Sequence, residues 1–151
     1  MIERVNVQTL DQAAVIHAVS WQASHSGFCS AQFVAAHTPE RQRNYLAEKM
    51  AHGTSVYLLS DGAPVGIVSV TGSLIEDLYV LPQAQRRGYG TRLLRFAIGQ
   101  CADRPTLWIL DNNAGARRLY ERNGFRFTGN VHRLSDTLTE LEFILPTGEH
   151  P

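Results

Sequence analysis

The chain of 151 residues has little cysteine, no long apolar run and no excess charge of either sign. Its two cysteines, Cys29 and Cys101, are too few for a disulfide framework and favour a reducing compartment. No segment approaches the roughly 20 apolar residues that span a bilayer. Residues 1–5 hold no basic stretch followed by an apolar run, so we expect no signal peptide. These absences predict a cytoplasmic protein without a membrane partner.

Charge is balanced, because Lys+Arg and Asp+Glu both number 14 and the formal net charge is zero. Lysine itself is scarce: Lys49 is the only one, beside thirteen arginines. Proteins that coat DNA or RNA are usually strongly basic, since phosphate neutralisation drives most of their affinity. The neutral total and the lack of a recognition-helix signature therefore argue against a nucleic-acid partner.

The composition is that of an ordinary globular protein, with 44% hydrophobic and 19% charged residues. A domain of this length buries roughly 70% of its unfolded surface, so it needs neither disulfides nor a metal to fold. No linker, repeat or low-complexity run divides the chain. We expect one domain over residues 1–146 and a frayed tail over 147–151.

Hydrophobic periodicity predicts the order of strands and helices. Strands are expected at 2–7, 55–59, 65–71, 74–81, 107–110, 125–128 and 138–145. Helices are expected at 10–24, from 39 to a stop at Gly53, at 90–101 and at 114–122, with a short further helix after Ser30. Thr9, Ser30 and Thr38 are predicted to cap their helices, and Asp61-Gly62 to turn a hairpin. This order is typical of an α/β fold (α+β by some definitions), a mixed sheet with helices on both faces.

The loop from Gln85 to Gly90 joins a strand that ends at Pro82 to the next helix. Glycines lack a Cβ, so successive backbone N–H groups can point into one concavity, and the helix adds its positive dipole end. Arg86 and Arg87 add positive charge. The loop therefore favours phosphate binding, although a strand–turn–helix with solvated arginines has the same pattern.

The loop differs from G-x-G-x-x-G and from the P-loop, which argues against dinucleotide and mononucleotide folds. It resembles the Q/R-x-x-G-x-G/A signature of the GNAT superfamily of N-acetyltransferases, with Gln85, Gly88 and Gly90 at the signature positions. The resemblance implies that acetyl-CoA is the cosubstrate and that the loop amides hold its pyrophosphate. The implied cofactor-binding residues are Leu78, Tyr79, Val80, Gln85, Arg86, Arg87, Gly88, Tyr89, Gly90, Thr91, Asn113 and Tyr120.

A second block is similar to another GNAT motif, an apolar strand followed by an asparagine, a helix with a tyrosine, and Gly-Phe. Here the motif is 107–110, Asn113, Tyr120 and Gly124-Phe125. Asn113 and Tyr120 are two helical turns apart and share a face, although a helix cap and a packed ring also explain them. The family fold implies a mostly antiparallel mixed sheet of about seven strands, splayed at the acetyl-CoA cleft between strands 74–81 and 107–110.

The resemblance also assigns catalytic roles. The Val80 amide is the implied oxyanion donor, and Tyr120 meets the departing thiolate. Residues 75–80 are similar to the corresponding strand of polyamine and diamine acetyltransferases, which makes Glu76 the base and Asp77 a contact for a cationic substrate. Adjacent strand residues face opposite sides, so at most one of these carboxylates is expected at the reacting centre. Either of them is also explained as a solvated strand acid.

Residues of the N-terminal half are the candidates for the acceptor site, because the family builds its acceptor pocket there. Trp21 and His25 are assigned to the substrate, while Trp21 and Phe28 are also compatible with the core. His25 and Cys29 are four residues apart, but no second pair at ligand spacing accompanies them, so no metal is expected. Cys101 is expected to be an inert buried thiol.

The sequence thus predicts transfer of acetyl from acetyl-CoA to a primary amine by direct attack, the acceptor being a small molecule or a protein amine. The alternative is the same fold as a non-catalytic module that senses acyl-CoA. Glu76, Asn113 and Tyr120 argue for catalysis. Five points stay open: the acceptor, the preferred acyl chain, whether Glu76 or Asp77 is the base, the role of His132, and the choice between monomer and homodimer.

Overall fold

Residues 1–146 are described in the computed structural model of the chain. Its strands are β1 (Ile2–Arg4), β2 (Ser55–Asp61), β3 (Ala63–Thr71), β4 (Leu74–Val80), β5 (Thr106–Leu110), β6 (Arg126–Arg133) and β7 (Thr139–Ile144). Its helices are α1 (Leu10–His25), α2 (Ala31–Ala35), α3 (Pro39–Ala51), α4 (Tyr89–Gln100), α5 (Ala114–Arg122) and the short 3-10 helix η1 (Pro82–Ala84). Every element expected from the sequence is present in the expected order. The tail expected over 147–151 lies outside the described residues.

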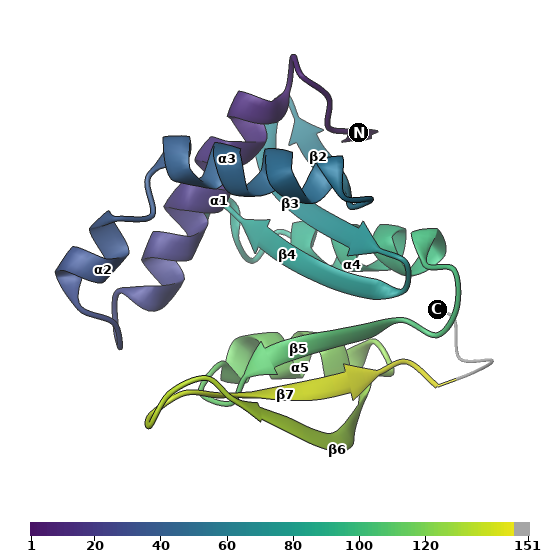
Figure 1. Cartoon of the computed structure of the whole chain (residues 1–151). Coiled ribbons are helices and arrows are strands. Elements are labelled where there is room, and N and C mark those ends of the chain that lie inside the picture. Colours follow the sequence, from purple (N-terminus) through teal and green to yellow (C-terminus); the bar gives the residue numbers. More distant parts are fainter. Residues whose placement is uncertain (147–151) are drawn as a thin grey trace.

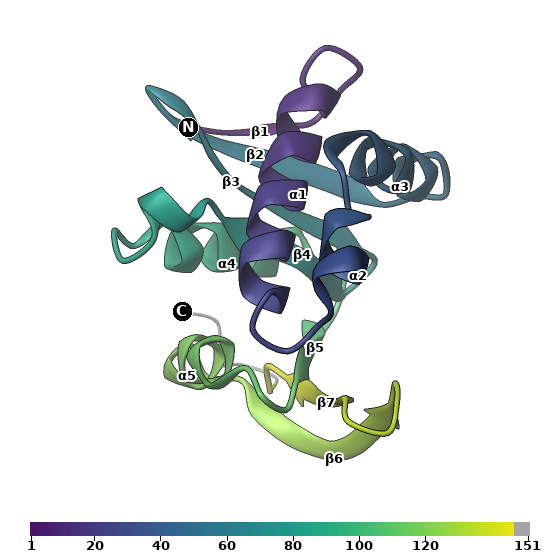
Figure 2. The same cartoon turned by 90° about the vertical axis from the view of Figure 1, so that its left-hand side faces the viewer.

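The strands form one seven-stranded sheet in the order β1-β2-β3-β4-β5-β7-β6. All neighbouring strands run antiparallel except β4 and β5, which are parallel. Helices α1 and α3 lie over one face of the β1–β4 half and α4 lies on the other, while α5 lies beside β5 and β7 (Figures 1 and 2). The predicted fold class, a mixed and mostly antiparallel sheet with helices on both faces, is confirmed.

Alternating side chains on β2 and β3 build a core on each face of the sheet. Leu58 and Ile67 are fully buried on the side of α1 and α3, whereas Leu59 and Val68 are fully buried on the side of α4. Burying one such side chain stabilises the fold by about 1.5–3 kcal/mol. The two-residue period of the strands therefore requires helices on both faces, which fixes α1 and α4 on opposite sides of β4.

Two of the three predicted helix caps are confirmed. Ser30 Oγ accepts a hydrogen bond from the Phe33 N–H at 3.2 Å, and Thr38 Oγ1 accepts one from the Arg41 N–H at 3.1 Å. The predicted stop of α3 is also present, because Gly53 adopts a φ of 98° directly after the helix. These local signals place α3, and with it the side chains on its last turn.

The predicted cap at Thr9 is wrong. The Thr9 hydroxyl makes no cap hydrogen bond to α1 and instead accepts from the Asn6 N–H at 3.0 Å. The Asn6 side chain in turn accepts from the N–H groups of Gln8 and Thr9, at 2.8 and 3.2 Å. Asn6 and Thr9 thus hydrogen-bond to each other within one turn and not to the helix. Strand β1 ends before this turn, at Arg4, whereas the sequence predicts a strand to residue 7.

Strand β6 extends to Arg133, past the end expected at residue 128. The pairing of β6 with β7 shifts register between Phe127 and Val131, and Gly129 has a φ of 95° inside that shift. Gly129 thus lies in a bulge, and the strand continues beyond it. The sequence predicts a strand end at this glycine, because glycine interrupts strand patterns.

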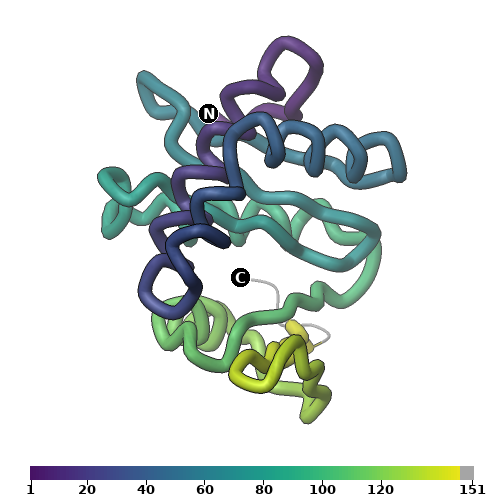
Figure 3. The backbone as a smooth tube through the Cα atoms, turned by 60° about the vertical axis from the view of Figure 1, so that its left-hand side comes forward, coloured from purple at the N-terminus to yellow at the C-terminus, as the bar shows by residue number. Residues whose placement is uncertain are grey.

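Strands β4 and β5 meet at one end only. Leu74 pairs with Thr106, whose N–H donates to the Ser73 carbonyl at 2.9 Å. Beyond this pair the described residues of β4 have no register partner on β5, and the two strands diverge toward their carboxyl ends (Figures 1 and 3). The predicted splay is confirmed, and it leaves one edge of β4 without a partner strand.

Candidate active site

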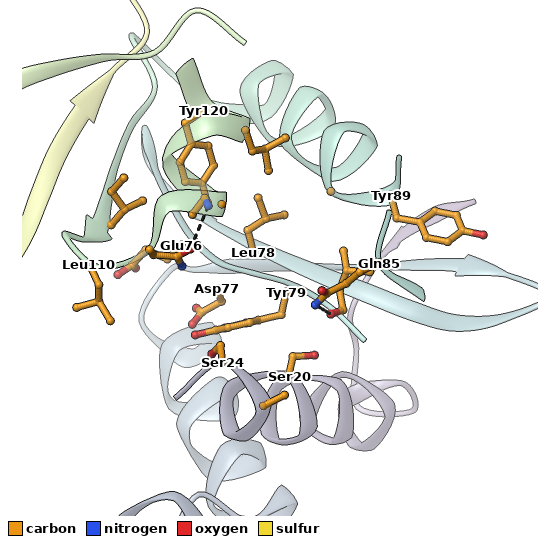
Figure 4. A pocket seen from close by; sticks show the side chains of 18 of the residues that line it. Ser20, Ser24, Glu76, Asp77, Leu78, Tyr79, Gln85, Tyr89, Leu110 and Tyr120 are labelled. Carbon is orange, nitrogen blue, oxygen red and sulfur yellow. Dashed lines mark hydrogen bonds between the residues drawn. The ribbon is translucent and has the colours of Figure 1, made fainter. Parts of the chain in front are cut away.

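A cleft of about 830 Å³ opens between the diverging halves of β4 and β5 (Figure 4). Its walls come from β4, the loop after it, β5, the first turn of α4, α5 and the second half of α1. The predicted cofactor-binding residues that line it are Leu78, Tyr79, Val80, Gln85, Arg86, Gly88, Tyr89, Gly90, Thr91, Asn113 and Tyr120. Arg87 is the one residue of that set that does not line it, whereas Glu76, Asp77 and His25 also do. The structure therefore brings both sequence motifs to one place.

The open edge of β4 presents backbone groups to the cleft. The Leu81 N–H donates to the Val65 carbonyl of β3 at 2.9 Å. N–H groups of successive strand residues point to opposite edges, so the Val80 N–H points away from β3 and toward the gap left by β5. The Val80 carbonyl accepts from Gln85 Nε2 at 3.1 Å, which ties the start of the glycine loop to the strand. Val80 thus offers an N–H donor without a strand partner.

The loop after β4 has a shape that receives an anion. Arg86 and Gly88 have φ values of 65° and 82°, so the backbone curls before α4 begins. The N–H groups of residues 89–91 have no acceptor inside the helix, because the first helical hydrogen bond runs from the Arg92 N–H to the Gly88 carbonyl at 3.1 Å. These donors, Arg86 and the helix dipole together fit the pyrophosphate that the sequence resemblance implies.

Tyr89 contributes its backbone to this loop and not its ring. Its side chain points away from the cleft (Figure 4), and its hydroxyl donates to Asp61 Oδ2 on β2. That hydrogen bond anchors the start of α4 to the neighbouring hairpin, which fixes the position of the helix N-terminus relative to the sheet.

Helix α5 brings Asn113 and Tyr120 to the cleft. The Asn113 side chain caps the helix by accepting from the Ala116 N–H at 3.0 Å. Tyr120 is buried, packs edge-on against Phe125, and points its ring into the cleft (Figure 4). Burial raises the pKa of the Tyr120 hydroxyl, so the phenol is protonated at neutral pH. Within residues 1–146 no acceptor binds this hydroxyl, which leaves it as a donor toward a ligand.

Glu76 and Asp77 lie on the same side of β4, and the prediction from strand alternation is wrong. The pairing of β3 with β4 shifts register between Ile67 and Ser69, and Asp77 has a φ of 53°. This bulge turns the Asp77 side chain back, so that Lys49 Nζ contacts Glu76 Oε1 at 2.9 Å and Asp77 Oδ2 at 2.7 Å. The alternation rule holds for a regular strand, and this strand is irregular at the site.

Asp77 is enclosed, with 8% of its side chain exposed. Its carboxylate accepts from His17 Nε2 at 3.0 Å, the Tyr45 hydroxyl at 3.1 Å, Lys49 Nζ at 2.7 Å and Ser69 Oγ at 2.7 Å. Burial alone would raise the pKa of Asp77, but the hydrogen bond from His17 and the charge of Lys49 outweigh it and hold the pKa well below its usual range. The residue predicted to contact substrate is therefore engaged by the protein itself on both oxygens.

Lys49, on the last turn of α3, joins the two carboxylates. Burial alone would lower its pKa, but the charge of Asp77 and hydrogen bonds to Asp77 and Glu76 outweigh it and raise the pKa, so the ammonium stays charged. Glu76 is 39% exposed and meets Lys49 through Oε1, while Oε2 has no hydrogen-bond partner in the described part of the chain. The sequence analysis assigned no role to Lys49. The one feature that could have drawn attention to it is that it is the only lysine in the chain.

His17 supports Asp77 from α1. Gln42 Nε2 lies 2.8 Å from His17 Nδ1 and donates to it, which puts the proton of the neutral ring on Nε2, the atom that donates to Asp77. The His17 ring also lies against Tyr79, with centroids 4.9 Å apart. Burial raises the pKa of Tyr79, so a neutral phenol lies beside Asp77 at the cleft (Figure 4).

The second half of α1 lines the cleft with Ser20, Ser24 and His25. Trp21 does not line it, because its ring is stacked between His25 and His37, with centroids 3.8 and 3.5 Å away. Burial lowers the pKa of His25. Of the two residues assigned to substrate on this helix, the structure thus places His25 at the cleft and Trp21 behind it.

Other residues singled out from the sequence lie at the margin. His132 pairs with Glu140 at 3.0 Å, and Glu140 lines the cleft. Phe28 lines a smaller hollow of about 310 Å³ next to His25. Burial raises the pKa of the Cys101 thiol to about 11, as suits an unreactive cysteine. Over residues 1–146, no three His, Cys, Asp or Glu side chains gather around a metal position, and no helix has the length and apolar character to cross a membrane.

Comparison with models of known protein families identifies the family of this chain. Residues 20–125 match the model of the acetyltransferase (GNAT) family. The chain belongs to the GNAT family. The matched segment includes every residue predicted to bind acetyl-CoA, from β4 to Tyr120. As a member of this family, the chain is an acyltransferase that depends on acetyl-CoA. No curated protein matches the chain in sequence.

Solved structures share this fold at low sequence identity. The apo form of YjaB from Escherichia coli has 22% identity and a TM-score of 0.74, with 96% of each chain covered. PaiA N-acetyltransferase from Thermoplasma acidophilum, in complex with coenzyme A, has 15% identity and a TM-score of 0.69, with 94% of this chain and 96% of that chain covered. Ribosomal-protein-alanine N-acetyltransferase from Brucella melitensis has 16% identity and a TM-score of 0.67, with 95% and 98% covered.

Proposed function

We propose that this GNAT protein transfers acetyl from acetyl-CoA to a primary amine of a small molecule or a protein, with Glu76 as the base. The observation that carries the proposal is that one cleft holds an anion-binding loop, the open edge of β4 and the Glu76 carboxylate. A donor that spans the loop and β4 brings its reactive end toward that carboxylate.

The donor end of the cleft is built from backbone. The amides of residues 89–91 and the Arg86 side chain would hold the pyrophosphate, and the open edge of β4 would pair with the amides of the pantetheine arm. When bound, acetyl-CoA supplies a thioester whose C–S bond breaks as the new C–N bond forms. The Val80 N–H is the donor proposed to polarise the thioester carbonyl, a role whose loss typically lowers a rate about 10²–10³-fold.

Tyr120 is proposed to donate a hydrogen bond to the sulfur that leaves. A free thiol has a pKa near 8.5 and a phenol one near 10, so full proton transfer from tyrosine to thiolate is unfavourable by about 2 kcal/mol. Burial raises the pKa of Tyr120 further, which makes full transfer less favourable still. Tyr120 therefore acts as a donor that strengthens as charge develops on sulfur.

Glu76 is proposed to take the proton from the attacking amine. An alkyl ammonium with a pKa of ~10 must lose its proton at pH 7, which costs about 4 kcal/mol. Lys49 holds Glu76 Oε1 in place, and Oε2 is the oxygen left to accept that proton, directly or through a water. The base is thus oriented by α3 and open to the cleft on one side.

The test is release of CoA from acetyl-CoA over a panel of amines. Glu76→Gln should lower the rate about 10²–10⁴-fold at neutral pH, with partial recovery at high pH where the amine arrives deprotonated. Glu48→Gln, on the exposed side of α3, is the matched control and should behave as wild type. A protein that binds CoA but acetylates no amine would instead be the non-catalytic acyl-CoA sensor.

A further inference from the structure

The charged groups at the acceptor end of the cleft nearly cancel. Lys49 carries one positive charge, and Glu76 and Asp77 carry one negative charge each. Burial raises the pKa of Tyr45 to about 12, and the pKa of Tyr79 is raised for the same reason, so both phenols that face Asp77 are neutral. This group of side chains therefore presents one net negative charge to a ligand.

The wall formed by α1 and β4 adds no further carboxylate to Glu76 and Asp77. His17 accepts from Gln42 and donates to Asp77, so its hydrogen bonds suit a neutral ring. The other carboxylate of the cleft, Glu140, lies on β7 across from this wall, where it contacts His132 Nδ1 at 3.0 Å. The neutral form of His25 is favoured by burial. This wall compensates one ammonium group, and Lys49, which lies behind Glu76 and Asp77, would repel a second one placed beside it.

Ser20 provides a neutral polar group at the same cleft. Ser20 lines the cleft and is 4% exposed, and its enclosed hydroxyl has no hydrogen-bond partner in the described structure. Ser24, one helical turn later on the same wall, differs because its hydroxyl donates to the Trp21 carbonyl at 3.0 Å. A buried hydroxyl left without a partner is uncommon and unfavourable, so a ligand group is the natural partner of Ser20.

We infer that the acceptor is a primary amine with a single positive charge and a neutral hydrogen-bonding group, such as a hydroxyl or carbonyl, and that Lys49 selects against polyamines. Lys49 is a positioning and specificity residue in this scheme, and Ser20 contacts the neutral group. The inference rests on the proposed function, because it names the substrate class of that same site.

The first experiment compares three acceptor series of equal chain length in the CoA-release assay: n-alkylamines, amino alcohols and α,ω-diamines, centred on n-butylamine, 4-amino-1-butanol and 1,4-diaminobutane. We expect the best amino alcohol to exceed the best diamine in kcat/KM by about tenfold or more, as one uncompensated charge at short range requires. A preference for diamines would overturn the inference while leaving the proposed function intact. No turnover with any amine would overturn both.

The second experiment changes the charge at position 49. Lys49→Gln keeps a hydrogen-bond donor for Asp77 but makes the group of Lys49, Glu76 and Asp77 one unit more negative, so the diamine to amino-alcohol ratio of kcat/KM should rise about tenfold. Lys49→Arg and the double change Lys49→Met with Asp77→Asn both keep the wild-type net charge and should leave that ratio unchanged. An unchanged ratio in Lys49→Gln would refute the role of Lys49. A rise in the double variant would show that side-chain size, and not charge, excludes the diamine.

The third experiment tests Ser20 without disturbing the buried charges, so it also serves if Lys49→Gln does not fold. Ser20→Ala should not lower the melting temperature, because the hydroxyl lacks a partner in the protein. It should lower kcat/KM for the amino alcohol about fivefold to thirtyfold relative to the matched alkylamine. Ser24→Ala is the control, since its hydroxyl is bound to Trp21, and should leave that ratio unchanged. Equal effects on both acceptors in Ser20→Ala would refute the contact.

Discussion

Asp77→Asn should destabilise the protein by about 3 kcal/mol at neutral pH. The change removes the charge from a side chain that is 8% exposed and accepts from Lys49 at 2.7 Å and His17 at 3.0 Å. Removing one partner of a buried ion pair costs about 3–5 kcal/mol, and we expect the lower end because Lys49 keeps Glu76. For a chain of 151 residues, this corresponds to a fall in melting temperature of about 6–12 °C.

The Asp77→Asn variant tests the loss of charge alone, because asparagine tolerates the backbone conformation at this position. Asp77 has a φ of 53°, a conformation that Asn adopts readily and alanine does not. Asp77→Ala should therefore cost about 1 kcal/mol more than Asp77→Asn, because it adds left-handed strain to the loss of the carboxylate. The order of the two variants separates the electrostatic part of the effect from the conformational part.

The pH dependence of stability provides the stringent check. The folded-state pKa of Asp77 is depressed, so its contribution to stability is complete above the ordinary value of 3.8 and is lost as the pH falls toward the folded-state pKa. Wild type and Asp77→Asn should thus differ most above about pH 5 and converge toward about pH 2 in urea unfolding. Equal stabilities at pH 7, or a difference that persists undiminished in acid, would refute the buried ion pair.

The other predictions concern the donor site and the leaving group. Gly90→Val should abolish CoA binding in calorimetry with little change in melting temperature, because a Cβ there would lie at an ordinary 3.6 Å from Leu119 Cδ2 while its methyl groups enter the anion site. Gly99→Val on the same helix, where a Cβ would meet no atom within 4 Å, is the control, and equal CoA affinity in the two variants would contradict the placement. Tyr120→Phe should keep CoA affinity and lower the rate about 10–10³-fold, with partial recovery on an acetyl donor whose thiol has a lower pKa. Equal loss with both donors would mean that Tyr120 positions substrate and does not assist the leaving group.

The local structure of the proposed cofactor side was predictable from sequence because its signals are local. A strand end, two spaced glycines and a helix N-terminus follow one another between Val80 and Gly90, and the structure shows the curled backbone and unbonded amides that this order predicts. The caps at Ser30 and Thr38 are local in the same sense, since a hydroxyl and an N–H three residues on decide them. The predicted cap at Thr9 was wrong because Asn6, three residues earlier, forms hydrogen bonds with Thr9 in place of the helix.

The acceptor side was decided by contacts that sequence neighbours do not encode. Lys49 and Asp77 are 28 residues apart, and only the packing of α3 against the sheet brings them to 2.7 Å. The bulge that places Glu76 and Asp77 on one side depends on the pairing of β4 with β3, which no pattern within β4 reveals. The sequence determined the fold and the curled loop before α4, because periodicity and glycine spacing are properties of short segments. Only the tertiary structure determined the net charge beside the proposed acceptor site, because that charge is a sum over side chains that the packing of α3 brings against β4.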